Sequence, residues 1–151
     1  MRFRKLFVCT VVIIAATFSA SPSWAQTGGN RFGVWDNSTD PNNVMTYEPF
    51  EQGGSKLTVS NPSKPGSDWS YETFFDGKFR PVAGQKNSET AVEIINDKSI
   101  RIYNKRDGVV YQVVINTLSD DNSKINNEYI RMDKDGKITG VTHVTYIRRK
   151  K

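Results

Sequence analysis

The stretch from Val109 to Leu118, which reads VVYQVVINTL, decides the fold. Its residues alternate between two faces with a period of two, as they do in a β-strand. Over residues 109–116 one face is wholly apolar, and the other, which holds Gln112 and Asn116, is still half apolar. Strands that are apolar on both sides belong in a closed barrel with an apolar lumen or in the middle of a sandwich. Residues 137–148 have the same two-sided pattern.

The rest of the chain after Trp35 continues this period, and no segment offers three turns of apolar residues at helical spacing. Asp-Gly pairs separate three pairs of β-rich runs, and this dipeptide readily adopts the positive φ of a tight hairpin. The pairs predict hairpins at Asp76-Gly77, Asp107-Gly108 and Asp135-Gly136. The predicted strands are residues 44–51, 56–60, 69–75, 78–81, 90–95, 99–104, 109–118, 124–132 and 137–148. We expect an all-β protein whose single antiparallel meander closes into a small barrel, with a β-sandwich as the alternative.

Residues 1–25 have the pattern of a cleavable secretory signal. A short basic head precedes an apolar core, residues 6–18, that is too short to cross a bilayer, so no stable membrane insertion is expected. Small residues follow it, and we predict cleavage after Ala25 and a periplasmic or secreted location. We expect a disordered start over residues 26–31, one barrel domain over 32–148 and a basic tail over 149–151.

Composition excludes several classes of function. Of 21 Lys and Arg residues, three lie in the signal, which holds none of the 16 acidic residues, so the exported part is close to neutral and has no nucleic-acid footprint. The one cysteine, Cys9, also lies in the signal, which leaves neither a thiol nor a disulfide. A single His143 cannot form a closed zinc site. We therefore predict no metal, no cofactor and no catalytic residue, with a hydrolase as the weaker alternative if His143 meets a buried carboxylate inside a pocket.

Aromatic residues are concentrated between positions 69 and 79. Most of them suit core packing, and some suit the lining of a lumen that holds a flat or apolar ligand. The predicted ligand-binding residues are Trp69, Tyr71, Phe74, Tyr111 and Tyr146.

Gly33-Val34-Trp35 resembles the Gly-x-Trp opening of lipocalin-type barrels. With Tyr47-Glu48-Pro49, Phe75-Asp76-Gly77-Lys78, Pro81-Val82-Ala83-Gly84 and a last strand ending in Tyr146, the layout of residues 32–148 is similar to a family of small, uncharacterised, exported bacterial proteins with a lipocalin-like barrel. The resemblance implies an envelope location and no established catalytic residues. It also implies that Trp35 plugs one end of the barrel and that Arg148 packs on it.

Two functions are compatible with these observations. The first is an exported barrel that binds a small apolar or lipidic ligand, motivated by the two-sided strands and the aromatic cluster. The alternative is an envelope module that binds or inhibits another protein through its loops at residues 37–43 and 61–67. The oligomeric state is left open.

Overall fold

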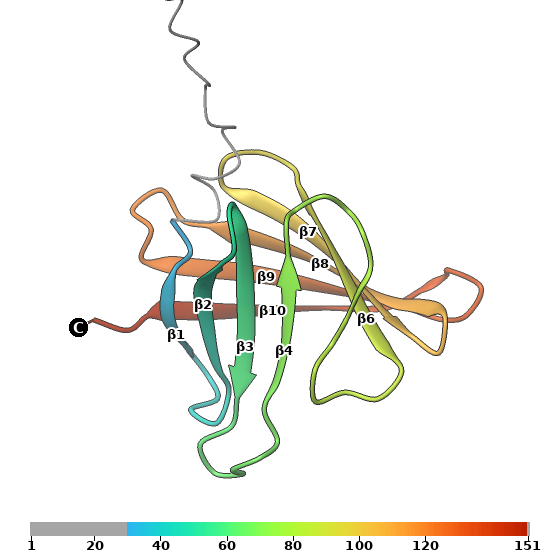
Figure 1. Ribbon diagram of the computed structural model, residues 1–151, viewed down its shortest axis with the longest axis horizontal. Helices are drawn as coiled ribbons and strands as arrows, with labels where there is room; N and C mark the ends of the chain where they lie inside the picture. The colour runs from blue at the N-terminus through green and yellow to red at the C-terminus, as the bar shows by residue number, and fades with distance from the viewer. Residues whose placement is uncertain (1–29, 151) are drawn as a thin grey trace, which may run out of the picture.

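The computed structural model describes residues 30–150, which form one antiparallel sheet of ten strands and contain no helix (Figure 1). The strands are β1 (Gly33–Asn37), β2 (Val44–Phe50), β3 (Gly54–Ser60), β4 (Trp69–Thr73), β5 (Arg80–Pro81), β6 (Ser88–Ile94), β7 (Ser99–Arg106), β8 (Val109–Leu118), β9 (Lys124–Met132) and β10 (Ile138–Arg148). The predicted signal and its cleavage point lie outside the described residues.

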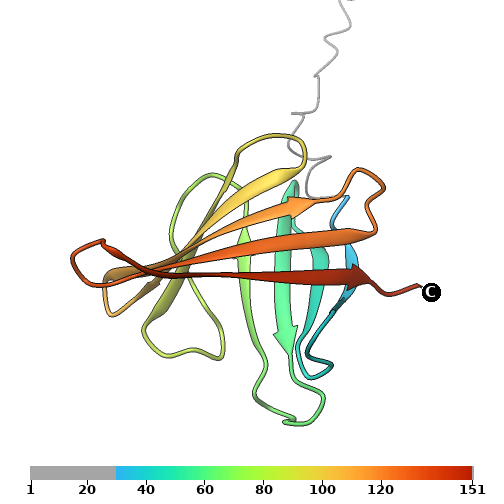
Figure 2. The ribbon, with the colours of Figure 1, turned by 180° about the vertical axis from the view of Figure 1, so that it is seen from behind.

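The sheet curls until its two edges meet, and Figures 1 and 2 show β1–β4 facing the long strands β7–β10 across the interior. Its order is β4-β3-β2-β1-β10-β9-β8-β7-β6-β5. The edges are joined by two hydrogen bonds between Ser70 and Ala83, with N···O distances of 3.0 and 2.8 Å. The prediction of an all-β meander that closes into a barrel is confirmed, and a sandwich does not form.

One strand was missed by the sequence analysis. The segment GVWDN of β1 is short and has no long alternation of its own. Its strand conformation comes from its neighbours, because it pairs with β2 on one side and with β10 on the other. This double pairing connects the N-terminal and C-terminal parts of the meander.

Two of the three predicted hairpins are confirmed. Asp107 and Gly108 both have positive φ, 49° and 83°, and join β7 directly to β8. Gly136, with a φ of 80°, closes the turn between β9 and β10. The third hairpin is wrong, because the Gly77 amide donates to the Val92 carbonyl of β6 at 2.9 Å and no ladder joins β4 to β5 at that point.

Inward-facing side chains form layers that follow from the strand registers. On the shorter wall, one row runs Gly33, Tyr47, Leu57, Tyr71 and the next runs Trp35, Met45, Val59, Trp69. On the longer wall, a mainly apolar row of Val92, Ile102, Val114, Tyr129 and Thr142 lies between a mixed row and a polar row. The mixed row places Asn116 and Asn127 among Ile94, Ile100 and Val144, and the polar row holds Thr90, Asn104, Gln112 and Arg131.

Trp35 closes one end of the barrel. It is fully buried, and its indole N–H donates to the Arg31 carbonyl at 2.8 Å. The Arg148 guanidinium carbon lies 4.1 Å from the centre of the indole ring, and Arg148 Nη1 donates to the Phe32 carbonyl at 2.7 Å. Gly33 has a φ of 132°, and a Cβ there would lie 3.1 Å from Arg148 Nη1, so glycine suits this position.

Both ends of the predicted barrel domain need correction. Arg31 is not part of a disordered start, because its side chain is fully buried and hydrogen-bonded to the barrel. Arg149 is not part of a free tail, because its amide donates to the Val34 carbonyl at 2.8 Å and its guanidinium pairs with Asp36. Backbone pairing of β10 with β1 carries the ordered chain one residue past the predicted end.

Candidate functional site

A cavity of about 330 Å³ lies between the two walls of the barrel. This volume is within the range of small-molecule sites. Its apolar lining comes from both walls. The apolar residues that line it include Met45, Leu57, Val59, Val82, Ile102, Val114 and Val144. None of these was predicted as a ligand contact, although all except Val82 lie on strands whose register places them on the inner face.

The structure places four of the five predicted ligand-binding residues in the cavity wall: Trp69, Tyr71, Tyr111 and Tyr146. Phe74 does not line the cavity. Its ring packs 5.7 Å from Phe50 and lies beneath the Arg80 guanidinium at 5.1 Å. The reason is strand alternation, since β4 turns Trp69, Tyr71 and Thr73 inward and leaves the next residue on the opposite side.

Tyr111 reaches the cavity through a β-bulge. The register of β7 against β8 shifts there, because Asn104 pairs with Gln112 while the next residue of β7 pairs with Val110. Tyr111 is the extra residue, and it lines the cavity together with its neighbour Gln112. A bulge re-aims a side chain that simple alternation would turn outward. The Arg106 guanidinium lies over the Tyr111 ring at 5.3 Å.

A directed chain of hydrogen bonds lies at the inner end of the cavity, which we define as the end next to Arg31 and Asn116. Arg31 Nε donates to Asn116 Oδ1 at 3.0 Å. Asn116 Nδ2 donates to Asn127 Oδ1 at 2.8 Å and to the Tyr47 hydroxyl at 3.4 Å. Asn127 Nδ2 donates to the Tyr129 hydroxyl at 3.0 Å. All of these bonds run from the buried guanidinium toward the tyrosines of the cavity.

Burial sets the protonation of this inner end. Burial lowers the pKa of the Arg31 guanidinium, and the nearby Tyr47 and Tyr71 partly offset this by raising it. Burial also raises the pKa of the Tyr47 hydroxyl to about 12 and raises those of Tyr71 and Tyr146. The three phenols are therefore neutral at physiological pH, and each keeps a proton to donate.

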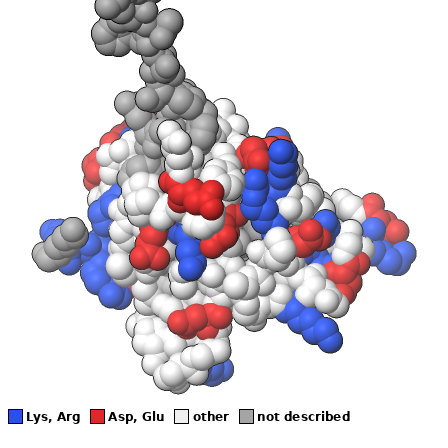
Figure 3. Space-filling view, in the orientation of Figure 1, with Lys and Arg blue, Asp and Glu red and all other residues white. Residues whose placement is uncertain are grey.

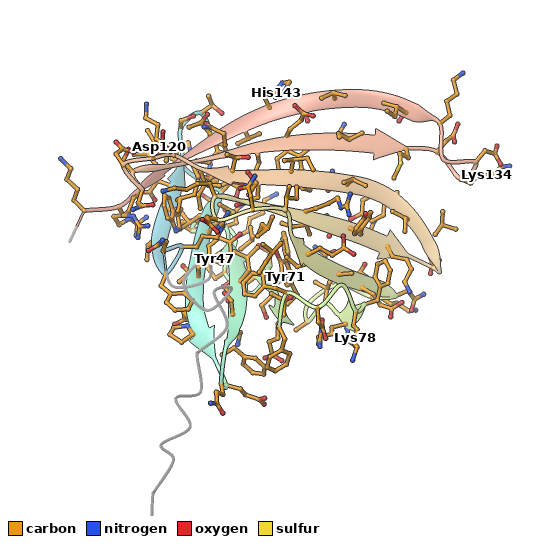
Figure 4. All side chains as sticks on the ribbon, turned by 90° about the horizontal axis from the view of Figure 1, so that it is seen from above. Tyr47, Tyr71, Lys78, Asp120, Lys134 and His143 are labelled. Carbon is orange, nitrogen blue, oxygen red and sulfur yellow. The ribbon has the colours of Figure 1, made fainter. Side chains whose placement is uncertain are left out.

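The Tyr71 hydroxyl is enclosed and has no hydrogen-bond partner among the described residues. The neighbouring Tyr47 hydroxyl approaches it, and each of the two phenols shifts the pKa of the other. An unpaired buried hydroxyl costs about 1–3 kcal/mol. Figure 4 shows Tyr47 and Tyr71 inside the barrel, on the wall opposite the long strands.

The opposite end of the cavity, which we call the mouth, is polar and open to solvent. Thr90 Oγ1 donates to Asn104 Oδ1, and Asn104 Nδ2 donates to Gln112 Oε1, both at 2.9 Å. The exposed Arg131 continues this row across β9. An ion pair of Lys105 with Glu89, 2.7 Å between Nζ and Oε2, also lines the cavity.

His143 lies on the outer face of β10, away from the cavity (Figure 4). Its Nε2 is 3.0 Å from Glu128 Oε2, and both side chains are largely exposed, at 72% and 44%. The hydrolase alternative required a buried carboxylate inside a pocket, and this pair does not provide one. Within residues 30–150 no three His, Cys, Asp or Glu side chains gather as they would around a metal ion.

On the face that Figure 3 shows, basic and acidic side chains are interspersed rather than gathered by sign. The loops of the alternative hypothesis adjoin one another, because the Ser63 hydroxyl donates to Asn42 Oδ1. The described part of the chain holds no helix of the length and hydropathy that crossing a membrane requires.

Comparison with known proteins defines the fold further. No protein-family model and no curated protein matches the sequence. Among solved structures, the chain is similar to a Schistosoma mansoni fatty acid binding protein in complex with arachidonic acid, with a TM-score of 0.60 and 9% identity over 82% of this chain and 99% of that one. A single-site mutant of the fluorescent protein UnaG gives 0.58 and 11% over the same shares, and wild-type UnaG gives 0.54 and 12% over 78% and 96%. The barrel therefore resembles the fold of fatty acid binding proteins.

Proposed function

We propose that this protein is an exported β-barrel that binds one small apolar or lipidic molecule in its cavity. The observation that carries the proposal is the cavity of about 330 Å³ with apolar side chains such as Met45, Leu57 and Val114 on both walls. An apolar ligand gains free energy when it leaves water for such a space, at roughly 25 cal/mol per Å² of apolar area buried. Against these apolar side chains water finds no hydrogen-bond partner.

A structural neighbour supports this proposal. The Schistosoma mansoni fatty acid binding protein, which shares this fold, was solved in complex with arachidonic acid. At 9% identity the likeness concerns the fold, so the ligand of the present chain depends on its own cavity residues. We propose binding without catalysis, since the groups in the cavity wall that most resemble catalytic ones, Glu89 and Lys105, are paired with each other.

Export is the second part of the proposal. The signal-like residues 1–25 would direct the chain to the periplasm or beyond the cell, where a soluble barrel can carry an apolar molecule through water. Sequencing the N-terminus of the protein from its native source should give Gln26 as the first residue. The resemblance to exported bacterial proteins with a Gly-x-Trp opening remains a prediction that favours the same location.

The binding proposal is tested by filling the cavity. Val144 lines it, whereas Val141 on the same strand faces outward and is 47% exposed. We expect the neutral fluorescent probe N-phenylnaphthylamine to bind the wild-type protein saturably and Val144→Trp to weaken that binding about tenfold or more, because the indole occupies the site.

Val141→Trp is the matched control and should bind the probe as the wild type does. Circular dichroism of both variants establishes that they remain folded. The absence of saturable binding to the wild type, or equal binding by the two folded variants, would contradict the proposed function.

A further inference from the structure

The inner end of the cavity holds a hydroxyl group, that of Tyr71, that makes no hydrogen bond to the described residues. Two described side-chain atoms are buried without a partner, Ser55 Oγ and the Tyr71 hydroxyl, and of these two residues only Tyr71 lines the cavity. Tyr71 is 4% exposed, so bulk water does not satisfy its hydroxyl. Buried hydroxyls almost always have a partner, and one left unpaired in a binding cavity is a candidate contact for the ligand.

The surroundings of Tyr71 favour an acceptor as that partner. Burial raises the pKa of its phenol, so the hydroxyl stays protonated and can donate. The Tyr47 hydroxyl beside it already accepts from Asn116 Nδ2, and the Arg31 guanidinium lies beyond. The side-chain hydrogen bonds that link Arg31, Asn116 and Asn127 are directed toward the cavity, and the last is donated by Asn127 to the Tyr129 hydroxyl. A second donor group would meet the positive field of Arg31, whereas an acceptor oxygen is attracted by it.

We infer that the ligand carries an acceptor oxygen at the end that enters the barrel first, and that the Tyr71 hydroxyl donates a hydrogen bond to it. The inference rests on the proposed function and specifies its ligand class. The rest of the molecule must be apolar, because apolar side chains such as Leu57, Ile102 and Val114 line the cavity. The class is an apolar chain or ring with a carbonyl, carboxylate, ether or hydroxyl oxygen at one end. Tyr71 is then the residue that selects for that oxygen.

The test compares ligands that differ only at that end. Decanoic acid, methyl decanoate and decanol each present an acceptor oxygen, and decene presents none. Each competes for the wild-type cavity against bound N-phenylnaphthylamine, which carries no oxygen. We expect the three oxygen-bearing compounds to displace the probe at lower concentration than decene does. In Tyr71→Phe that advantage should fall by roughly three- to tenfold, the range that loss of one hydrogen bond produces.

Tyr103→Phe is the matched control, since it also removes one phenol hydroxyl but Tyr103 on β7 does not line the cavity. It should keep the full advantage of the oxygen-bearing compounds. Binding of decene itself should be the same in all three proteins. Tyr71→Phe should also be as stable toward urea as the ligand-free wild type, or more stable, because it removes a hydroxyl without a partner. A purely structural role for Tyr71 predicts the reverse, a loss of stability with unchanged selectivity.

The outcomes separate this inference from the proposed function. If the probe and decene bind but the oxygen-bearing compounds gain nothing in the wild type, or keep their advantage in Tyr71→Phe, the inference is wrong and the apolar cavity stands. If no compound and no probe binds the wild type, both are wrong. Comparison of the acid with its methyl ester then shows whether the acceptor oxygen is preferred with or without charge.

Discussion

At the scale of single residues, the barrel holds an uncommon element for an apolar core, a buried guanidinium joined to a chain of amides. Arg31 and Asn116 are both fully buried. Arg31 Nη2 also donates to the Lys98 carbonyl at 2.7 Å, which helps to offset the cost of removing the charge from water. Because each member of the chain has a partner, the network favours one arrangement of β8 and β9 over shifted registers.

The buried tyrosines make stability depend on alkaline pH. Burial raises the pKa of Tyr47 to about 12, from an ordinary value near 10. A group with a raised pKa in the fold gives its full stabilisation below the unfolded pKa and loses it as the pH rises through the folded pKa. The free energy of unfolding should therefore fall between about pH 10 and pH 12. Tyr71 and Tyr146, shifted in the same direction, add to the fall.

The measurement is a titration of tyrosinate absorbance alongside circular dichroism. Three of the six tyrosines, Tyr47, Tyr71 and Tyr146, should gain their tyrosinate signal only as the β-sheet signal disappears. Tyr47→Phe should remove one residue from this late phase. Ionisation of all six tyrosines while the β-sheet signal persists would contradict the assignment.

At the scale of elements, turns and bulges decide which side chains reach the cavity. The bulge at Tyr111 brings two adjacent residues of β8 to the cavity, and a second register shift lies between Ile138 and Gly140 on β10. The two-residue hairpin at Asp107-Gly108 holds β7 and β8 in the register from which the bulge starts. This hairpin is therefore a structural requirement of the mouth.

Gly108→Ala tests that requirement. Gly108 has a φ of 83°, where an L-residue is strained even though open space surrounds it. We expect the variant to lose about 1–2 kcal/mol of stability in urea denaturation. Gly140→Ala is the control, because Gly140 has open space and no positive φ. Equal effects of the two substitutions would mean that backbone strain at the hairpin is not what stabilises it.

The barrel could be predicted from sequence because alternation with apolar residues on both faces is a local property of β8 and β10. Local sequence could not show that Asp76-Gly77 does not form a hairpin, because the Asp-Gly dipeptide also occurs in other turns that need a positive φ. Asp76 is held by Arg80, Oδ1 to Nη1 at 2.7 Å, and the turn rests on β6 instead of starting a new hairpin. Which strand a turn rests on is set by long-range pairing.

The candidate site was predictable to a similar degree. Aromatic residues on strands were recognised, and Phe74 was misplaced although alternation from Trp69 puts it on the other face. Asn116 and Asn127 were missed because their meeting depends on the register between β8 and β9. One sequence feature could have indicated them, namely a polar residue on an otherwise apolar inward face, such as Asn127 between Ile125 and Tyr129. Arg31 precedes the first strand and left no such signal.

At the scale of the whole molecule, the fold is a container with one plugged end and one polar mouth. Trp35 and Arg148 seal the inner end, and the row from Thr90 to Arg131 borders the mouth. Between β4 and β5 the barrel is joined by the bridge of Ser70 with Ala83 instead of a full ladder. A container of this form suits the binding of one apolar molecule that we propose.

Native mass spectrometry of the protein purified from its own source, without detergent or added ligand, tests this account most directly. The account predicts a chain that begins at Gln26 and carries one additional small molecule, released on denaturation, with an apolar body and an oxygen at one end. Val144→Trp, purified in the same way, should lack that molecule. A wild-type protein recovered folded and with no bound molecule, even after incubation with a lipid extract of its source, would contradict the central claim.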